Sequence, residues 1–367
     1  MKNPSKIGAG QLLLVIFLSR VVITLTYGVS AGVHSVNNAD WLASLFMPIL
    51  LTLLALPTFW FLKVSGNGDV CTFAYSIGKG IGRITSFLYG VLFLVLAFSP
   101  ISRFSFFVTS VMQPEKGHWF FPILIILPVC FGAMKGVQAI VRTGALLSVV
   151  GILSIVVIVL ALISRLDMLN VYSPFYDGVR EVADSLSLMV ANSMELSIIL
   201  MLAPRVKGSL PKAYFGYVCL VTVFLFLVMF TVVAVLGEFA QLQLFPFYSV
   251  AGVAKIGELS NLSALEASVW IVGVFIKSAL YLYLSANCFC HLFPSRLRTV
   301  ILLVLGAVVA VLAALTSANV TNAQRNFSTA GSLVVQGIFL VLFPILLAVT
   351  GKIKRRMYGE KMFMSAD

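Results

Sequence analysis

The run Ala191-Asn-Ser-Met-Glu195 is the most informative part of this chain, because it sets polar side chains in the middle of an apolar segment, residues 182–203. A segment of roughly 20 apolar residues is long enough to cross the hydrocarbon core of a bilayer as a helix. Backbone that unwinds at that depth is tolerated only where it lines a cavity. The run therefore predicts a membrane helix that is interrupted beside a cavity.

A second run of this kind, Thr24-Leu-Thr-Tyr-Gly-Val-Ser-Ala-Gly32, lies in the first apolar segment, residues 10–33. Matching interruptions in the two halves of a chain are typical of transporters built from inverted repeats, with the binding site near the bilayer midplane. The alternative is a pair of ordinary helices whose small residues permit close packing. The pattern favours interrupted helices near 24–30 and 191–195, in contact at the bilayer centre.

The composition supports a membrane protein, since 60% of the 367 residues are apolar and 10% are charged. Soluble domains carry about 25% charged residues, so the deficit excludes a soluble domain, a disordered chain and a nucleic-acid-binding module. The stretch 237–261 is more polar and is expected to form an interfacial loop with a short helix. Ten apolar segments are candidate membrane spans: residues 10–33, 40–62, 83–112, 119–134, 137–163, 182–203, 212–236, 262–291, 299–317 and 329–350.

Ten spans leave no room for a second domain. We therefore predict an all-α integral membrane protein of one transmembrane domain, residues 1–367. The first repeat would cover 10–163, the second 182–350, and a basic cytoplasmic tail 351–367. With ten spans both termini share one side of the membrane, and that side holds 17 of the 25 Lys and Arg residues against five on the other. Because cytoplasmic loops are rich in Lys and Arg, both termini are expected in the cytoplasm.

Four charged residues lie well inside the predicted spans, away from their ends: Arg20, Arg103, Glu195 and Lys277. A charge at the bilayer centre costs at least about 2.5 kcal/mol, so such residues normally face the bundle interior and have partners. Glu195 is the only acid of the four, and Lys277 is its expected partner, with Arg103 as the next choice. The pair either handles a ligand or a proton, or it is a static ion pair that fixes helix register.

No motif of an enzyme or a cofactor site is present. The sequence lacks a Gly-x-Gly-x-x-Gly loop, a P-loop and a His-Glu-x-x-His motif. Its five Cys residues are an odd number and lie mostly inside or beside the apolar segments, which does not indicate a disulfide framework. We therefore predict no catalytic activity, no cofactor and no metal site.

The segment Trp270-Ile-Val-Gly-Val-Phe-Ile-Lys-Ser-Ala-Leu-Tyr-Leu-Tyr283 carries a resemblance to a known family. Together with Arg205-Val-Lys207 and Phe245-Pro-Phe-Tyr248, it resembles the B subunits of spore germinant receptors. These are the endospore germination permeases of the amino acid–polyamine–organocation superfamily. The run Asn192-Ser-Met-Glu-Leu196 keeps the family's Glu and departs from its Gly and both Phe residues.

The resemblance implies the leucine-transporter fold, in which two inverted repeats of five helices have their first helices unwound. It also implies a small nutrient germinant, commonly an amino acid, bound among helices 1, 3, 6 and 8. The implied partners are a receptor A subunit and a lipoprotein C subunit in the spore inner membrane. We expect the ligand-binding residues to be Thr24, Thr26, Tyr27, Gly28, Phe98, Ser102, Asn192, Ser193, Met194, Glu195, Lys277 and Tyr281.

Three functions fit the sequence. The first is a receptor subunit that senses a nutrient, the second is a proton-coupled amino acid transporter, and the third is a scaffold that only assembles the A and C subunits. In this fold a sodium ion lies between helices 1 and 8. The positive charge of Lys277 could take the place of that ion. That substitution disfavours sodium coupling, and the polar residues retained in helices 1, 6 and 8 disfavour a pure scaffold.

Replacement of Gly28 by Leu should abolish the germination response without lowering the amount of protein in the membrane. The reason is that free backbone N–H groups at an interrupted helix 1 would bind the carboxylate of an amino acid, and a bulky residue at Gly28 would block them. The measurement is a dose–response curve for germination, with the protein level followed by immunoblot. A normal curve in the variant would remove this segment from the site.

Overall fold

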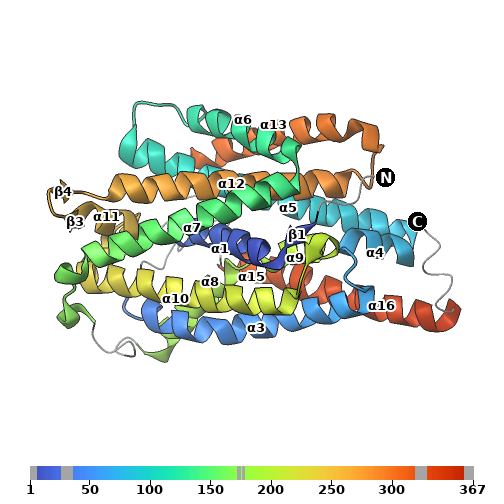
Figure 1. Cartoon of the computed structure of the whole chain (residues 1–367), viewed down its shortest axis with the longest axis horizontal. Coiled ribbons are helices and arrows are strands. Elements are labelled where there is room, and N and C mark those ends of the chain that lie inside the picture. The colour runs from blue at the N-terminus through green and yellow to red at the C-terminus, as the bar shows by residue number, and fades with distance from the viewer. Residues whose placement is uncertain (1–5, 26–35, 172–174, 176–177, 319–328, 359–367) are drawn as a thin grey trace.

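Long apolar helices packed side by side make up nearly all of the molecule, as its computed structural model shows (Figure 1). The structure describes residues 6–25, 36–171, 175, 178–318 and 329–358. The longer helices are α1 (Ala9–Leu25), α3 (Asp40–Ser65), α5 (Lys79–Phe107), α6 (Phe120–Lys135), α7 (Val137–Ala161), α8 (Val179–Ala191), α10 (Leu210–Leu236), α12 (Ser263–Phe289), α13 (Arg298–Ser317) and α16 (Phe343–Tyr358). The shorter elements are β1 (Ile7–Gly8), α4 (Val70–Ile77), α9 (Leu196–Leu202), β2 (Val206–Lys207), α11 (Pro246–Val253), β3 (Lys255–Ile256), β4 (Leu259–Ser260) and α15 (Thr329–Gln336), with π-helical turns at Val108–Met112 and Gly337–Leu342 and 3₁₀ turns at Ile163–Arg165, Met168–Asn170, Ala203–Arg205, Gly237–Leu242 and Ser295–Leu297.

Eight helical segments of the described chain are long and apolar enough to cross a membrane, and two further apolar helices, α1 and α6, are shorter. The eight are Asp40–Ser65, Lys79–Met112, Val137–Ala161, Val179–Arg205, Leu210–Leu242, Ser263–Phe289, Arg298–Ser317 and Thr329–Arg356. Each predicted span therefore coincides with an apolar helix, although the first, 10–33, is described only as far as Leu25. The stretch 237–261 forms the expected loop, with the short helix α11 and the hairpin β3–β4.

The sixth span is interrupted where the sequence predicts it. Helix α8 ends at Ala191 and α9 begins at Leu196, so residues 192–195 leave the helix. The side chain of Asn192 donates to the carbonyl of Leu188 (2.9 Å), and the hydroxyl of Ser193 donates to the carbonyl of Met189 (3.1 Å). Short polar side chains that bond to nearby backbone in this way compete with helix formation.

The backbone groups released by the interruption are bonded by two other spans. Gln336, at the end of α15, donates from its amide nitrogen to the carbonyl oxygens of Val190 (2.8 Å) and Ser193 (2.7 Å). Arg20 of α1 donates to the carbonyl of Met189 (2.8 Å). Because a buried carbonyl without a donor is costly in hydrocarbon, these bonds make the interruption compatible with membrane depth.

Helix α12 is the central helix of the bundle and packs against α1, α5, α6, α7 and α13 (Figure 1). Its contact with α1 is close, because an added Cβ at Gly273 would lie 2.4 Å from a methyl group of Val22. Lys277 follows Gly273 by one turn and is buried on the same side. The absence of a side chain at Gly273 therefore brings the polar part of α12 against α1.

One end of the bundle gathers connections that are far apart in the sequence. Strand β1 pairs in parallel with β2, which joins the residues before α1 to those after α9. Lys354 of α16 donates to the carbonyls of Ser76 (3.0 Å) and Ile77 (2.7 Å) at the end of α4. Tyr75 of α4 donates to the carbonyl of His291 (2.9 Å), just after α12. This end is formed by connections for which the sequence predicts a cytoplasmic location.

Replacement of Gln336 by Met should destabilise the protein while the side-chain volume is kept, because two buried hydrogen bonds would be lost. The carbonyl of Ser193 would lose its amide donor, and the carbonyl of Val190 would keep the backbone N–H of Ser193. The expected loss in the free energy of unfolding is about 2–3 kcal/mol. The measurement is thermal unfolding in detergent, with Gln241→Met as the control, since Gln241 is exposed. Equal unfolding temperatures for the two variants would contradict this role of Gln336.

Candidate functional site

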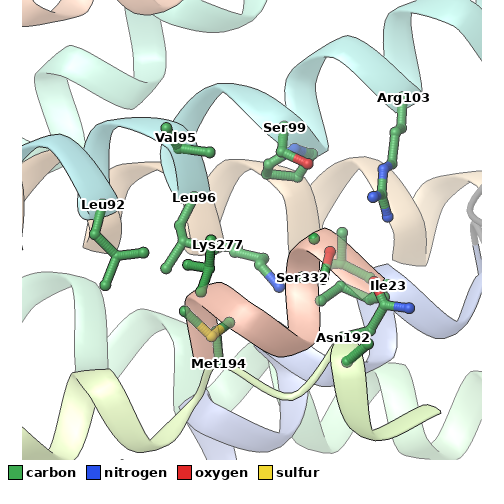
Figure 2. A pocket seen from close by; sticks show the side chains of 15 residues that line it. Ile23, Leu92, Val95, Leu96, Ser99, Arg103, Asn192, Met194, Lys277 and Ser332 are labelled. Carbon is green, nitrogen blue, oxygen red and sulfur yellow. The ribbon is translucent and has the colours of Figure 1, made fainter. Parts of the chain in front are cut away.

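A cavity of about 250 Å³ lies beside the interruption of the sixth span (Figure 2). Helices α1, α5, α12 and α15 enclose it together with the residues that link α8 to α9. Its lining residues are Val22, Ile23, Leu92, Val95, Leu96, Ser99, Pro100, Arg103, Ala191, Asn192, Met194, Lys277, Gly331, Ser332 and Val335. The cavity is therefore in contact with the predicted interruption, as unwound backbone at this depth requires.

Helix α5 forms the longest wall of the cavity. Leu92, Val95, Leu96, Ser99 and Arg103 are spaced by three or four residues, so they share one face of the helix. The three aliphatic residues come first along the chain and the two polar residues follow. The spacing of this face thus makes one end of the wall apolar and the other polar and positively charged.

The interruption supplies a neutral polar group and a sulfur atom. Asn192 and Met194 lie on the irregular backbone between α8 and α9, and both line the cavity. Asn192 is half-buried, whereas Met194 is buried. The break in the helix lets residues two apart in sequence face the same cavity, which a continuous helix would not permit.

The ammonium group of Lys277 links α12 to two other spans. Its Nζ donates to the carbonyl of Ser19 in α1 (2.8 Å) and lies 3.8 Å from Oε1 of Glu195 at the start of α9. Both side chains of this ion pair are almost fully buried, 3% and 2% exposed. Lys277 also lines the cavity and Glu195 does not, so the ammonium lies between the carboxylate and the cavity.

Further polar groups surround the ion pair. The hydroxyl of Tyr217 in α10 donates to Oε2 of Glu195 (3.4 Å). The ring of Tyr281 lies 5.8 Å from Lys277 Nζ, and its hydroxyl is buried. Two nitrogens of Arg20 are likewise buried without a partner in the described part of the chain. Polar groups of α1, α10 and α12 thus surround the buried ion pair.

Comparison with known proteins identifies the family. The family model described as spore germination protein matches residues 6–321. The chain belongs to this spore germination protein family. The germination protein is also similar to a solved structure titled "Substrate-bound outward-open state of a Na+-coupled sialic acid symporter", with a TM-score of 0.53 and 10% identity over 97% of this chain and 91% of that one. This likeness shows a transporter-type fold, and no curated protein matches the sequence.

Three of the predicted ligand-binding residues line the cavity of the germination protein, namely Asn192, Met194 and Lys277. Arg103, predicted as an alternative partner of Glu195, lines it as well, and its side chain lies at one end of the cavity (Figure 2). Glu195 and Tyr281 are behind Lys277, in contact with it and outside the lining. The structure thus brings the interruption, the ion pair and the arginine of α5 to one place.

Four further predicted residues do not line the cavity. Ser102 of α5 accepts a hydrogen bond from Thr316 of α13 (2.7 Å), so it faces the neighbouring helix. Thr24 donates to the carbonyl of Arg20 (3.2 Å), one turn earlier in α1. Ser193 bonds to its own helix, and Phe98 is buried outside the lining. The remaining three, Thr26, Tyr27 and Gly28, lie outside the described residues.

The wall formed by α15 was not predicted from the sequence of the germination protein. Gly331, Ser332 and Val335 line the cavity, and Gln336, the residue after Val335, bonds to the interruption. The available indication was a Gln inside the last apolar segment, 329–350. No group of three or more His, Cys, Asp or Glu residues within the described ranges is arranged to hold a metal ion.

Glu195→Gln and Lys277→Met should each destabilise the protein by about 3 kcal/mol, because each leaves the other charge buried without its partner. The double variant should lose less than the sum of the two. The measurement is a double-mutant cycle on unfolding in detergent.

The exposed pair Arg180–Asp184 is a matched control, since its charged atoms are also 3.8 Å apart. The same cycle on that pair should show little coupling, because exposed ion pairs are screened by water and salt. Additive losses for the buried pair would show that Glu195 and Lys277 do not interact.

Proposed function

We propose that this germination protein is the membrane subunit of a germinant receptor and that it binds a small nutrient in the cavity beside residues 192–195. An amino acid is the first candidate ligand. The observation that carries the proposal is the position of the cavity, which combines an interrupted span with polar groups of α5, α12 and α15. Small-molecule sites combine an apolar lining with a few placed polar groups, and this lining has that composition.

We also propose that the ten apolar segments are membrane spans arranged as two inverted repeats of five helices, 10–163 and 182–350. Support comes from eight long and two shorter apolar helices and from the likeness to a symporter fold. The excess of Lys and Arg at the end formed by β1, β2, α4 and α16 favours a cytoplasmic location for that end and for the tail, 351–367.

The proposed partners are a receptor A subunit and a lipoprotein C subunit in the spore inner membrane. Membership of the spore germination family and the resemblance of the segment Trp270–Tyr283 to receptor B subunits support this assembly. Among the described residues, large aliphatic side chains are exposed on the outer helices, for example Leu127, Leu146 and Leu153. Lipid or partner subunits would cover these surfaces.

A proton-coupled amino acid transporter is the second candidate function. The buried ion pair between Lys277 and Glu195 favours it, because the pair joins α12 to the start of α9 in the interrupted span and lies next to the cavity. A proton shared by such a pair would couple ligand binding to charge. A receptor that binds without transport and a transporter differ in one observable, which is uptake of the bound nutrient.

The test is a ligand screen on the purified chain in detergent, followed by uptake into proteoliposomes for each compound that binds. A receptor should show a rise in unfolding temperature with at least one amino acid or other nutrient and no uptake. Binding together with uptake driven by a proton gradient would favour the transporter. A complete absence of binding by the chain, alone and with its A and C subunits, would leave only the scaffold.

Ligand binding should not depend on sodium. The ammonium of Lys277 already bonds to the α1 carbonyl of Ser19 and lies beside Glu195, so a cation is present between α1 and α12. The measurement is the dissociation constant of any ligand found in the screen, with Na⁺ replaced by choline at equal ionic strength. A loss of affinity in choline would contradict the substitution of sodium by Lys277.

A further inference from the structure

The last apolar span changes its helix type directly after the part that borders the cavity. Helix α15 ends at Gln336, a π-helical turn covers Gly337–Leu342, and α16 begins at Phe343. Ser332 of α15 lines the cavity, and Gln336 bonds to the interruption of the sixth span. Turns of the π type inside α-helices are rare and frequently lie at functional sites. Since this turn joins α15 to α16, it decides how α15 is oriented relative to the rest of its span.

The sequence gives a reason for the π-helical turn. The backbone N–H of Phe343 bonds to the carbonyl of Ile338, five residues earlier, and not to that of Phe339. The next residue, Pro344, has no N–H, and inside an α-helix its ring would clash with the carbonyl of Leu340. Neither position 343 nor position 344 then supplies a backbone donor to Phe339. The turn therefore needs a donor from another span, because a carbonyl buried in the membrane must be bonded.

Two hydroxyl groups of other spans supply such donors. The hydroxyl of Tyr89 in α5 donates to the carbonyl of Phe339 (2.7 Å), and the hydroxyl of Thr58 in α3 donates to the carbonyl of Leu340 (3.4 Å). Both side chains are fully buried. The two carbonyls lie five and four residues before Pro344, where an N–H at position 344 would donate in a π-helix and in an α-helix. The hydroxyls thus take the place of the bond that proline cannot make.

The position of Tyr89 links this turn to the cavity. Its ring packs edge-on against Phe339 (5.2 Å between ring centres) and Phe343 (6.1 Å), which are stacked on each other. Tyr89 also precedes Leu92 by three residues, so it continues the face of α5 that forms the longest wall of the cavity. One face of α5 therefore contacts both the cavity and the turn that orients α15.

Loss of the Tyr89 hydroxyl would have a consequence at a distance. The carbonyl of Phe339 could then be bonded only if the N–H of Phe343 turned to it from Ile338, which would convert the π-helical turn into an α-helical one. The extra residue would rotate α15 by about 100° relative to α16 and move it by about 1.5 Å along the axis. Gln336 would turn away from the interruption, and α15 would present other residues to the cavity.

From these observations we propose that Tyr89 is a positioning residue for the cavity. Its hydroxyl holds the π-helical turn, and the turn holds α15 in the orientation in which Ser332 lines the cavity and Gln336 bonds to the interruption. The consequence for ligand binding rests on the proposed function, whereas the consequence for Gln336 does not.

The first experiment is a double-mutant cycle of Tyr89→Phe with Gln336→Met, followed by thermal unfolding of the purified full-length protein in detergent. Tyr89→Phe keeps the ring and removes only the hydroxyl. The two side chains bond to carbonyls of different spans, so two merely local losses would add. We expect the fall in unfolding temperature caused by Gln336→Met to shrink to about half or less in Tyr89→Phe, because Gln336 has already left the interruption.

Tyr214→Phe is the matched control for this cycle. The buried hydroxyl of Tyr214 in α10 donates to the carbonyl of Leu51 in α3 (3.0 Å), so the variant loses a bond of the same kind outside the last span. Gln336→Met should keep its full effect in Tyr214→Phe. Additive losses for Tyr89→Phe as well would overturn the inference.

A second cycle, of Tyr89→Phe with Pro344→Ala, tests the cause of the turn. Alanine at position 344 restores an N–H that can bond to the turn, so Tyr89→Phe should lower the unfolding temperature less in this background than in the parent. An equal loss in both backgrounds would overturn the inference. If Tyr89→Phe alone fails to fold, folding of the double variant is the expected rescue, and failure of both would also overturn it.

The ligand readout repeats the binding screen with the standard amino acids as probes. An amino acid that binds the parent should bind about tenfold more weakly to Tyr89→Phe and equally well to Tyr214→Phe. Unchanged affinity in Tyr89→Phe would overturn the positioning of the cavity, even if the first cycle shows coupling. If nothing in the wider nutrient screen binds the parent, the proposed function fails and the cavity part of the inference fails with it, while the two cycles still decide whether Tyr89 positions α15.

Discussion

The structure depends on one constraint, which is that every backbone polar group released inside a membrane must find a partner. The sixth span leaves the helix at 192–195, and the donors that make this possible come from α1 and α15, at opposite ends of the sequence. Arg20 and Gln336 therefore stabilise the interruption from outside the span, through hydrogen bonds to its carbonyl groups. Once those bonds are made, α1, α8, α9 and α15 are held around the same point, and the cavity is the space that side chains do not fill.

The same constraint explains what the sequence predicts well. Charged and amide side chains are rare in apolar segments because they are costly there, so each one is informative. This is why the interruption and the proximity of Glu195 to Lys277 follow from composition and position alone. The family membership that the sequence resemblance suggested is shown by the match over residues 6–321.

Which side of a helix faces the cavity is harder to predict, because it depends on the neighbours. Ser99, Ser102 and Arg103 are within one turn of α5, yet Ser102 bonds to Thr316 of α13 while the other two line the cavity. A rotation of 100° per residue separates these directions, and only the position of α13 decides which is which. The contribution of α15 was not predicted for a similar reason. Gly331 and Ser332 are small residues of a common kind, and only the packing of α15 against its neighbours places them in the cavity lining.

The short parallel pairing of β1 with β2 has a mechanical consequence. Ile7 pairs with Val206 and Gly8 with Lys207, so the residue before α1 and the residues after α9 form one small sheet. Two paired residues on each side therefore tie the start of α1 to the end of α9. A displacement of α1 would then be transmitted to α9 through the paired strands, and a displacement of α9 to α1. Opening toward this end of the molecule would then require α1 and α9 to move together or the pairing of β1 with β2 to break.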